Sequence, residues 1–315
     1  RLSRDTATSV GCLMRAAAPH QERSDDPAQE VAVLGRVLER DPFHDEAATR
    51  LEQLLVQREA WSELVDVLRR RLDVVEAGAQ PGGGSAVQAE IELLARMAWI
   101  QREHLRQPLE AVATLGRSLQ LDPNHLPTLL TLGELHTGLE QWKEAVDIYG
   151  RVIQVASDPD VLRMAHVRLG DMWSERLRDH RRAISCYQNV LALAARDSEA
   201  LGKLFELFYR SRDWDNASDT VSRLIEVESS PQRLVSYHTA LADIHEQGFS
   251  DPRAAAAQLE QAAAIDAANE EVLSELSRLY TQLGDWEALA TAVRSFLAAL
   301  PAEAEARGVP HRMRL

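Results

Sequence analysis

The stretch LEQWKEAVDIY, Leu139–Tyr149, places a tryptophan at the start of an amphipathic helical pattern, and its recurrence decides the fold. Three other segments carry a tryptophan in the same setting: REAWSELVDVL, SRDWDNASDTV and LGDWEALATAV. The four tryptophans are Trp61, Trp142, Trp214 and Trp286, with spacings of 81, 72 and 72 residues. The chain is therefore internally repetitive.

A second kind of segment lies between the tryptophan segments. Its markers each stand 34 residues before a tryptophan: Pro27, Pro108, His180 and Pro252. The return to the next marker takes 38 residues, except for 47 in the first case, where the excess coincides with the Gly-rich stretch AGAQPGGGS at 77–85. Periods of this size are typical of solenoids in which each helical hairpin buries its apolar face against its neighbours.

Each unit contains two helical patterns. Leu129, Leu132 and Leu135 follow helical spacing, the pattern breaks at 140–141, and a second amphipathic pattern starts at Trp142. This order predicts a helix, a tight turn and a second helix. Alternate units carry an extra turn residue, as in DMWSERLRDHRRA, which predicts longer odd-numbered hairpins.

These residues resemble the tetratricopeptide repeat (TPR), a pair of antiparallel helices with Leu-Gly in the first helix, an aromatic after the turn, and Ala and an aromatic in the second. The matching residues are Leu132-Gly133, Trp142, Ala145 and Tyr149 in one unit, and Leu169-Gly170, Ala183 and Tyr187 in the next. LGDW at 283–286 resembles the turn and LDPN at 121–124 the junction. The resemblance implies an all-α right-handed superhelix, an α-solenoid of about eight hairpins beginning near residues 8, 45, 89, 126, 162, 198, 234 and 270.

The resemblance also predicts the domain organisation. We expect an N-terminal extension at 1–7, a single TPR solenoid over 8–300 with a Gly-rich loop at 77–86, and a basic C-terminal tail at 301–315. Three residues depart from the repeat pattern: Ala16 replaces the usual Leu, Glu30 the usual Ala, and Phe205 the usual Gly.

Composition narrows the range of partners. A net charge of −14 argues against nucleic-acid binding, which depends on neutralising phosphates with Lys and Arg. The sequence has no run of about 18 apolar residues, so no membrane span is predicted. Lys143 and Lys203 are the only lysines, an arginine bias that we interpret as codon usage in a GC-rich bacterial genome.

Cys12 and Cys186 lie far apart in the sequence and suggest neither a disulfide framework nor a metal site. We therefore expect a reducing, cytoplasmic location. The chain opens without a methionine, so a targeting segment upstream remains an alternative.

Catalytic signals are weak. The chain has no HExxH, Walker or GxSxG motif, its histidines are scattered, and we expect no enzyme activity, cofactor or metal. His44 and His125 occupy equivalent repeat junctions, which favours a structural role.

For the repeated tryptophans we expect packing within the hairpin rather than a ligand-stacking platform. Trp173 falls at a packing position, whereas Trp99 falls at a position that faces the concave groove in TPR arrays.

The groove position, two residues after the consensus Leu, carries four successive carboxylates. Across the motifs it holds Gln53, Trp99, Glu134, Asp171, Glu206, Asp243 and Arg278, with Tyr209 and Glu246 one turn further on. This pattern predicts an acidic groove that attracts a basic peptide or helix; the competing interpretation is an ordinary solvated face. The Lys and Asn of the TPR carboxylate clamp are missing, so acidic chaperone tails are not the expected partners.

We therefore expect a non-catalytic scaffold or adaptor for protein–protein interaction. The alternative is a regulatory or assembly arm of a larger multidomain enzyme or effector. Self-association is a further alternative, because Arg307, Arg312 and Arg314 make the C-terminal segment locally basic and able to complement an acidic groove. A helical-repeat RNA binder is disfavoured by the charge.

Overall fold

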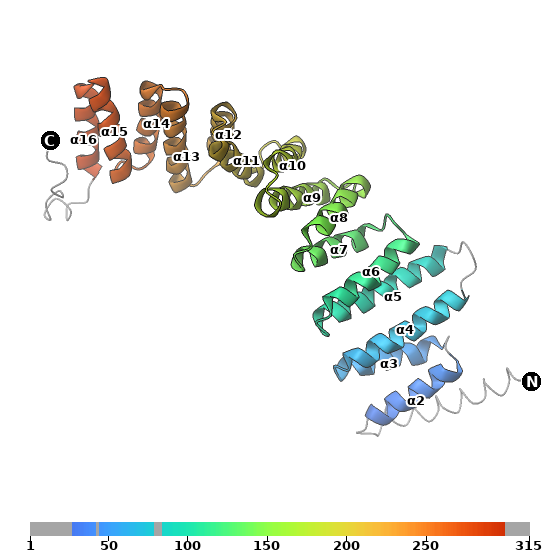
Figure 1. Ribbon diagram of the computed structural model, residues 1–315. Coiled ribbons are helices and arrows are strands. Elements are labelled where there is room, and N and C mark those ends of the chain that lie inside the picture. The colour runs from blue at the N-terminus through green and yellow to red at the C-terminus, as the bar shows by residue number, and fades with distance from the viewer. Residues whose placement is uncertain (1–26, 42–43, 79–83, 300–315) are drawn as a thin grey trace, which may run out of the picture. The chain divides into compact units, whose positions relative to one another are not determined.

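The computed structural model describes residues 27–41, 44–78 and 84–299. Within these ranges the chain forms 15 α-helices, two short π-helical segments and no strand (Figure 1). Two compact units divide the chain after Ala156, and each is described by itself. The prediction of an all-α helical-hairpin fold is confirmed.

The first unit contains seven described helices. They are α2 (Pro27–Arg40), α3 (Asp45–Gln57), α4 (Trp61–Gly78), α5 (Gly84–Glu103), α6 (Pro108–Leu121), α7 (Leu126–Gly138) and α8 (Trp142–Val155). Each helix packs on the next along the chain, most extensively within the pairs α5–α6 and α7–α8. The expected hairpins of motifs two to four are therefore present, and α2 supplies the second helix of the first motif.

The second unit repeats the same order. It contains α9 (Pro159–Asp171), η1 (Met172–Arg176), α10 (His180–Leu193), α11 (Ser198–Ser211), α12 (Trp214–Val227), α13 (Pro231–Asp243), η2 (Ile244–Gly248), α14 (Pro252–Ile265), α15 (Glu270–Leu283) and α16 (Trp286–Ala299). Contacts again link successive helices, so the unit buries its apolar surface between neighbouring hairpins.

Parts of the predicted organisation lie outside the described residues: the extension at 1–7, the tail at 301–315, Ala16, and the centre of the Gly-rich loop. Helix α4 ends at Gly78 and α5 begins at Gly84. The division into one solenoid with two end segments stays a prediction.

Helix starts follow local chemistry. Pro159 and Pro231 take the first position of α9 and α13, where a missing N–H costs nothing. The carboxylates of Asp197 and Asp213 accept backbone N–H groups at the starts of α11 and α12. His44 accepts the N–H of Ala47 in the same way at α3.

The turns inside the hairpins are of two kinds. Each contains one residue in the left-handed region: Glu59, Arg106, Glu140, Arg178, Arg212, Ser250 and Gly284. In motifs five and seven the extra residue becomes a π-helical turn, in which the Leu177 N–H donates to the Met172 oxygen at 3.0 Å and the Phe249 N–H to the Ile244 oxygen at 3.2 Å. The predicted lengthening of these hairpins is confirmed.

In the core of two hairpins, a glycine of the first helix faces a large aromatic ring of the second helix. A Cβ on Gly170 would lie 2.6 Å from the ring of Tyr187, which is fully buried. A Cβ on Gly133 would lie 2.9 Å from the ring of Tyr149. In the hairpin after Gly170 and Tyr187, Phe205 stands at the glycine position and Val221 at the tyrosine position. Both residues belong to the same core cluster.

The repeated tryptophans pack partly as predicted. Trp214 contacts Tyr209 of its own first helix edge to face, with ring centroids 5.6 Å apart. Trp214 also contacts the following hairpin, which the sequence did not predict: a Cβ on Gly248 would lie 2.5 Å from Trp214 Cγ. Trp61 likewise stacks on His104, at 3.6 Å between centroids. Trp286 departs from this pattern, since 61% of its surface is exposed.

Candidate functional site

The predicted groove residues lie on the first helices of successive hairpins. In the first unit Trp99 of α5 is 52% exposed and touches His104 by its edge, with centroids 4.9 Å apart. Glu134 of α7 accepts a hydrogen bond from Arg102 of α5 at 3.3 Å. The first helices of these two neighbouring hairpins, α5 and α7, are therefore linked by an ion pair.

In the second unit Asp171 is paired on two sides. The Nζ of Lys203, on α11, lies 2.9 Å from Asp171 Oδ1 and 3.3 Å from Glu175 Oε1. Tyr187 donates its hydroxyl to Asp171 at 2.8 Å. Burial opposes the charge on Lys203, but its bonds to the two carboxylates raise its pKa. The negative charge of Asp171 is thus compensated within the chain.

Asp243, at the end of α13, has a different setting. Tyr209 donates its hydroxyl to Asp243 at 3.5 Å, and within the described part of the chain this carboxylate makes no ion pair. Burial, and then the neighbouring Glu275 and Glu246, raise the pKa of Asp243. Burial and the same contact raise the pKa of Tyr209. Asp243 is therefore a partly buried carboxylate that its surroundings do not neutralise.

Glu246 and Arg278 form a bidentate pair between η2 and α15. The two Nη atoms of Arg278 donate to Glu246 at 2.8 and 2.6 Å, and Nε donates to Glu275 at 2.8 Å. The guanidinium lowers the pKa of Glu246. Glu206 is paired along its own helix with Arg210, at 2.6 Å.

The sequence pattern missed the cations of this surface. It compared one position per first helix, whereas Lys203 lies one turn before Glu206, and Arg102 one turn after Trp99. A comparison of neighbouring turns across successive motifs would have found them. The rarity of lysine also marked Lys203 as unusual.

A cavity of about 990 Å³ opens between α13 and α15. Its lining contains the carboxylates of Asp243, Asp266, Glu271 and Glu275 and no Lys, Arg or His. Pro231, Ile265 and Val272 form apolar parts of its wall. The cavity therefore combines negative charge with surface suited to an aliphatic side-chain stem.

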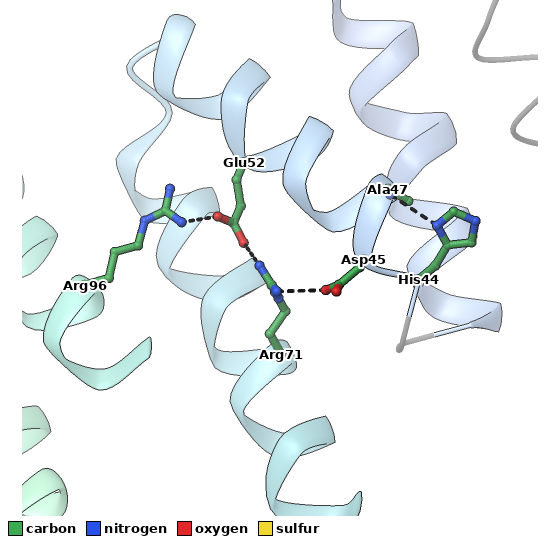
Figure 2. Close-up of polar contacts among 6 residues, drawn as sticks. All are labelled: His44, Asp45, Ala47, Glu52, Arg71 and Arg96. Carbon is green, nitrogen blue, oxygen red and sulfur yellow. Dashed lines mark hydrogen bonds and ion pairs between the residues drawn. The ribbon is translucent and has the colours of Figure 1, made fainter. Parts of the chain in front are cut away.

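A buried carboxylate joins three helices of the first unit (Figure 2). Glu52 of α3 is 5% exposed at its side chain and accepts hydrogen bonds from Arg71 of α4, at 2.5 Å, and from Arg96 of α5. Arg71 also pairs with Asp45 at 3.1 Å. These contacts tie the hairpin to its successor, so we assign Glu52 a structural role.

Glu30, the departure from the usual Ala, is another buried carboxylate. It accepts a hydrogen bond from Arg50 of α3 at 2.8 Å, which satisfies its charge. The histidines at the repeat junctions make contacts close by in the sequence: His125 Nδ1 lies 2.8 Å from Thr128 Oγ1. Among the residues with described positions, no group of three or more His, Cys, Asp or Glu side chains could hold a metal ion.

Comparisons with known proteins agree with this architecture. Residues 128–161 match the sequence model of the Tetratricopeptide repeat family. No curated protein sequence matches the chain.

Solved structures resemble the chain in fold. The C-terminal part of a TPR repeat-containing protein from Cytophaga hutchinsonii aligns with a TM-score of 0.50 and 15% identity, over 85% of this chain and 98% of that one. A tetratricopeptide repeat protein from Parabacteroides merdae aligns with a TM-score of 0.37 and 14% identity, over 87% and 99%. YrrB, described as a TPR protein with an unusual peptide-binding site, aligns with a TM-score of 0.43 and 16% identity, over 62% and 98%.

The described helices pack as successive hairpins, which is the arrangement of an α-solenoid. Residues 128–161 match a tetratricopeptide repeat, as the sequence predicted, and the described helices share the fold of tetratricopeptide repeat proteins. Repeats of this kind generally serve protein–protein interaction and are generally non-catalytic. None of the described helices has both the length and the apolarity to cross a membrane.

Proposed function

We propose that the chain is a non-catalytic scaffold that binds a basic peptide or helix of a partner protein in an acidic groove formed by its first helices. The observation that carries this proposal is the acidic cavity between α13 and α15, beside the predicted groove residue Asp243. A cleft with one sign of charge steers a partner of the opposite sign and fixes its register.

The remaining predicted groove residues have assigned roles in this proposal. Glu134, Asp171 and Glu206 hold ion pairs with nearby cations, so they shape the surface and supply little uncompensated charge. Trp99 offers an exposed indole for apolar contact. Tyr209 orients Asp243, and the Glu246–Arg278 pair borders the cavity side of α15.

The proposal is tested by affinity capture from the source organism with the full chain as bait. A variant with Glu134→Gln, Asp171→Asn, Glu206→Gln and Asp243→Asn serves as the comparison. We expect specific partners to bind the native bait, and to bind the variant more weakly and with a flatter salt dependence. Equal capture by both baits at every salt concentration would remove the acidic groove from the proposal.

The regulatory-arm alternative concerns the protein that contains this chain. It predicts that the native product in the source organism is much longer than 315 residues. Immunodetection or intact mass measurement of that product distinguishes the two readings. A cytoplasmic location remains our expectation from the two isolated cysteines, of which Cys186 is free in the structure.

A further inference from the structure

The 72-residue period provides an internal comparison for the cavity. Helices α9 and α11 are the counterparts of α13 and α15, residue by residue, at a shift of 72 positions. Both pairs lie in the second unit. Differences between equivalent side chains therefore show what the cavity has lost or gained relative to its neighbour.

In the earlier pair, cations of the chain itself occupy the space between the helices. Arg163 of α9 pairs with Asp197, and its Nη2 donates to Glu199 at 2.9 Å. Lys203 of α11 pairs with Asp171 at 2.9 Å. The α9–α11 surface thus shows how this repeat geometry holds a guanidinium and an ammonium group against carboxylates.

In the later pair these cations are replaced, two of the carboxylates that they contact remain, and Asn269 stands at the position of Asp197. Val235 stands at the position of Arg163, and Glu275 at that of Lys203. Asp243 and Glu271 are the counterparts of Asp171 and Glu199. A third cation of the earlier pair, Arg168, is also replaced, by Ala240. The positions that line the cavity carry four carboxylates and no cation, whereas their counterparts carry four carboxylates and three cations.

The retained carboxylate Asp243 and the gained carboxylate Glu275 both line the open cavity. Asp243 has only the Tyr209 hydroxyl as its side-chain partner among the described residues, and Glu275 shares Arg278 with Glu246. Apolar surface at Pro231 and Ile265 lies in the same lining. A long aliphatic stem with a terminal positive charge matches both parts of this wall.

We propose that the cavity between α13 and α15 binds an arginine side chain from a segment of a partner protein, in the place that Arg163 and Lys203 fill 72 residues earlier in the chain. Arginine is favoured over lysine because its planar fork of five donors can contact more than one of the four carboxylates in the lining. This inference rests on the proposed protein-binding function and identifies the anchor residue of the ligand.

The first experiment selects ligands without assuming their sequence. A phage library of random dodecapeptides is selected in parallel on the full native chain, on a Val235→Arg/Glu275→Lys variant, and on Asp219→Asn. The double variant gives α13–α15 the two paired cations of α9–α11, those at the positions of Arg163 and Lys203. Asp219→Asn removes one charge from an exposed site on α12 and is the matched control. We expect native and control chains to enrich the same peptides, which share an arginine at one position, and the double variant to lose them.

The second experiment measures the arginine contact directly. An enriched peptide, labelled with fluorescein, is titrated by fluorescence anisotropy against the native chain, Asp243→Asn and Asp219→Asn. We expect Asp243→Asn to weaken binding about tenfold or more, and Asp219→Asn to change it less than twofold. Replacing the arginine of the peptide by citrulline, which has the same shape without the charge, is expected to weaken binding to a similar degree. Circular dichroism confirms the helical content of each variant.

A gain-of-function variant completes the test. Arg163→Val with Lys203→Glu removes the two cations that pair with the carboxylates of the α9–α11 surface and gives these two positions the residues of α13–α15. We expect the stoichiometry of peptide binding to rise from one to two. The first two experiments remain decisive if this variant loses helical content.

The outcomes separate the two proposals. Enriched peptides that lack arginine, or that bind the native chain and Asp243→Asn equally, overturn the arginine cavity and leave protein binding intact. Failure of all three chains to enrich any peptide, together with no specific partner in the capture experiment, overturns both. Loss of binding in Asp243→Asn and with the citrulline peptide supports the inference.

Discussion

Replacing Gly170 by alanine tests the packing of the repeat most directly. The added methyl group would meet three ring atoms of Tyr187 at 2.6 to 3.0 Å, and this ring is fully buried. Overpacking of a core costs about 1–3 kcal/mol, while glycine to alanine inside a helix recovers roughly 0.5–1 kcal/mol. We therefore expect Gly170→Ala to lower the free energy of unfolding by about 1–2 kcal/mol.

Gly202 is the matched control for this prediction. It lies inside helix α11 of the same unit, and a Cβ there would meet nothing within 4 Å. Gly202→Ala is expected to raise the free energy of unfolding by roughly 0.5–1 kcal/mol, so the same substitution has opposite signs at the two positions. Urea denaturation followed by circular dichroism measures both, with m-values compared because repeat arrays can lose two-state behaviour.

The chain itself suggests the compensating change. Two hairpins later, at a shift of 72 residues, Ala242 and Leu259 occupy the positions of Gly170 and Tyr187 and lie in one core cluster. Adding Tyr187→Leu to Gly170→Ala should therefore give a double variant more stable than the sum of the single effects, with a coupling of about 1 kcal/mol or more. If Gly170→Ala is as stable as Gly202→Ala, or the cycle shows no coupling, the steric argument is wrong.

Three further predictions concern turns, buried charge and pH. Glu140 and Gly284 are turn residues in the left-handed region, a conformation that costs a non-glycine residue roughly 1–2 kcal/mol. Glu140→Gly should therefore raise the urea midpoint of unfolding, and Gly284→Ala should lower it. Shifts of both midpoints in the same direction would contradict this. Glu52→Gln should destabilise by about 2 kcal/mol, because the amide keeps one acceptor oxygen for two arginines and loses the negative charge that both contact. Asp45→Asn, whose side chain is 91% exposed, should cost under about 0.5 kcal/mol. Equal losses in urea denaturation would argue against a structural role for Glu52. The raised pKa of Asp243 means that the native state loses stability as pH rises from the ordinary carboxyl range to the raised value, and this loss persists at neutral pH. Asp243→Asn should therefore be at least as stable as the native chain at pH 7 and lose that advantage in acid, as thermal unfolding at several pH values would show; a marked loss of stability at pH 7 would refute it.

The site could be predicted only in part from the sequence, because charge at a surface depends on pairs of residues. Helical spacing placed Glu134 and Asp171 on first helices, and they lie on α7 and α9; their role in a groove stays a prediction. Their pairing with Arg102 and Lys203 depends on where neighbouring first helices lie, which one position per motif does not reveal. The same limitation hid the buried carboxylate of Glu52, which in sequence is one of many acidic residues in a helix.

The sequence by itself determined the helical hairpins through its 72-residue period and its small-residue positions. A chain that repeats the same apolar spacing, turn and tryptophan at this period has few other ways to bury its apolar surface. The tertiary structure decided the second partner of each packed tryptophan, the π-helical turns, and the contrast between the filled α9–α11 surface and the open α13–α15 cavity. The physical reason is that periodicity fixes which face of a helix is buried. Which side chain lies opposite it depends on contacts 20 to 44 residues apart in the chain, such as Arg50 with Glu30 and Arg96 with Glu52.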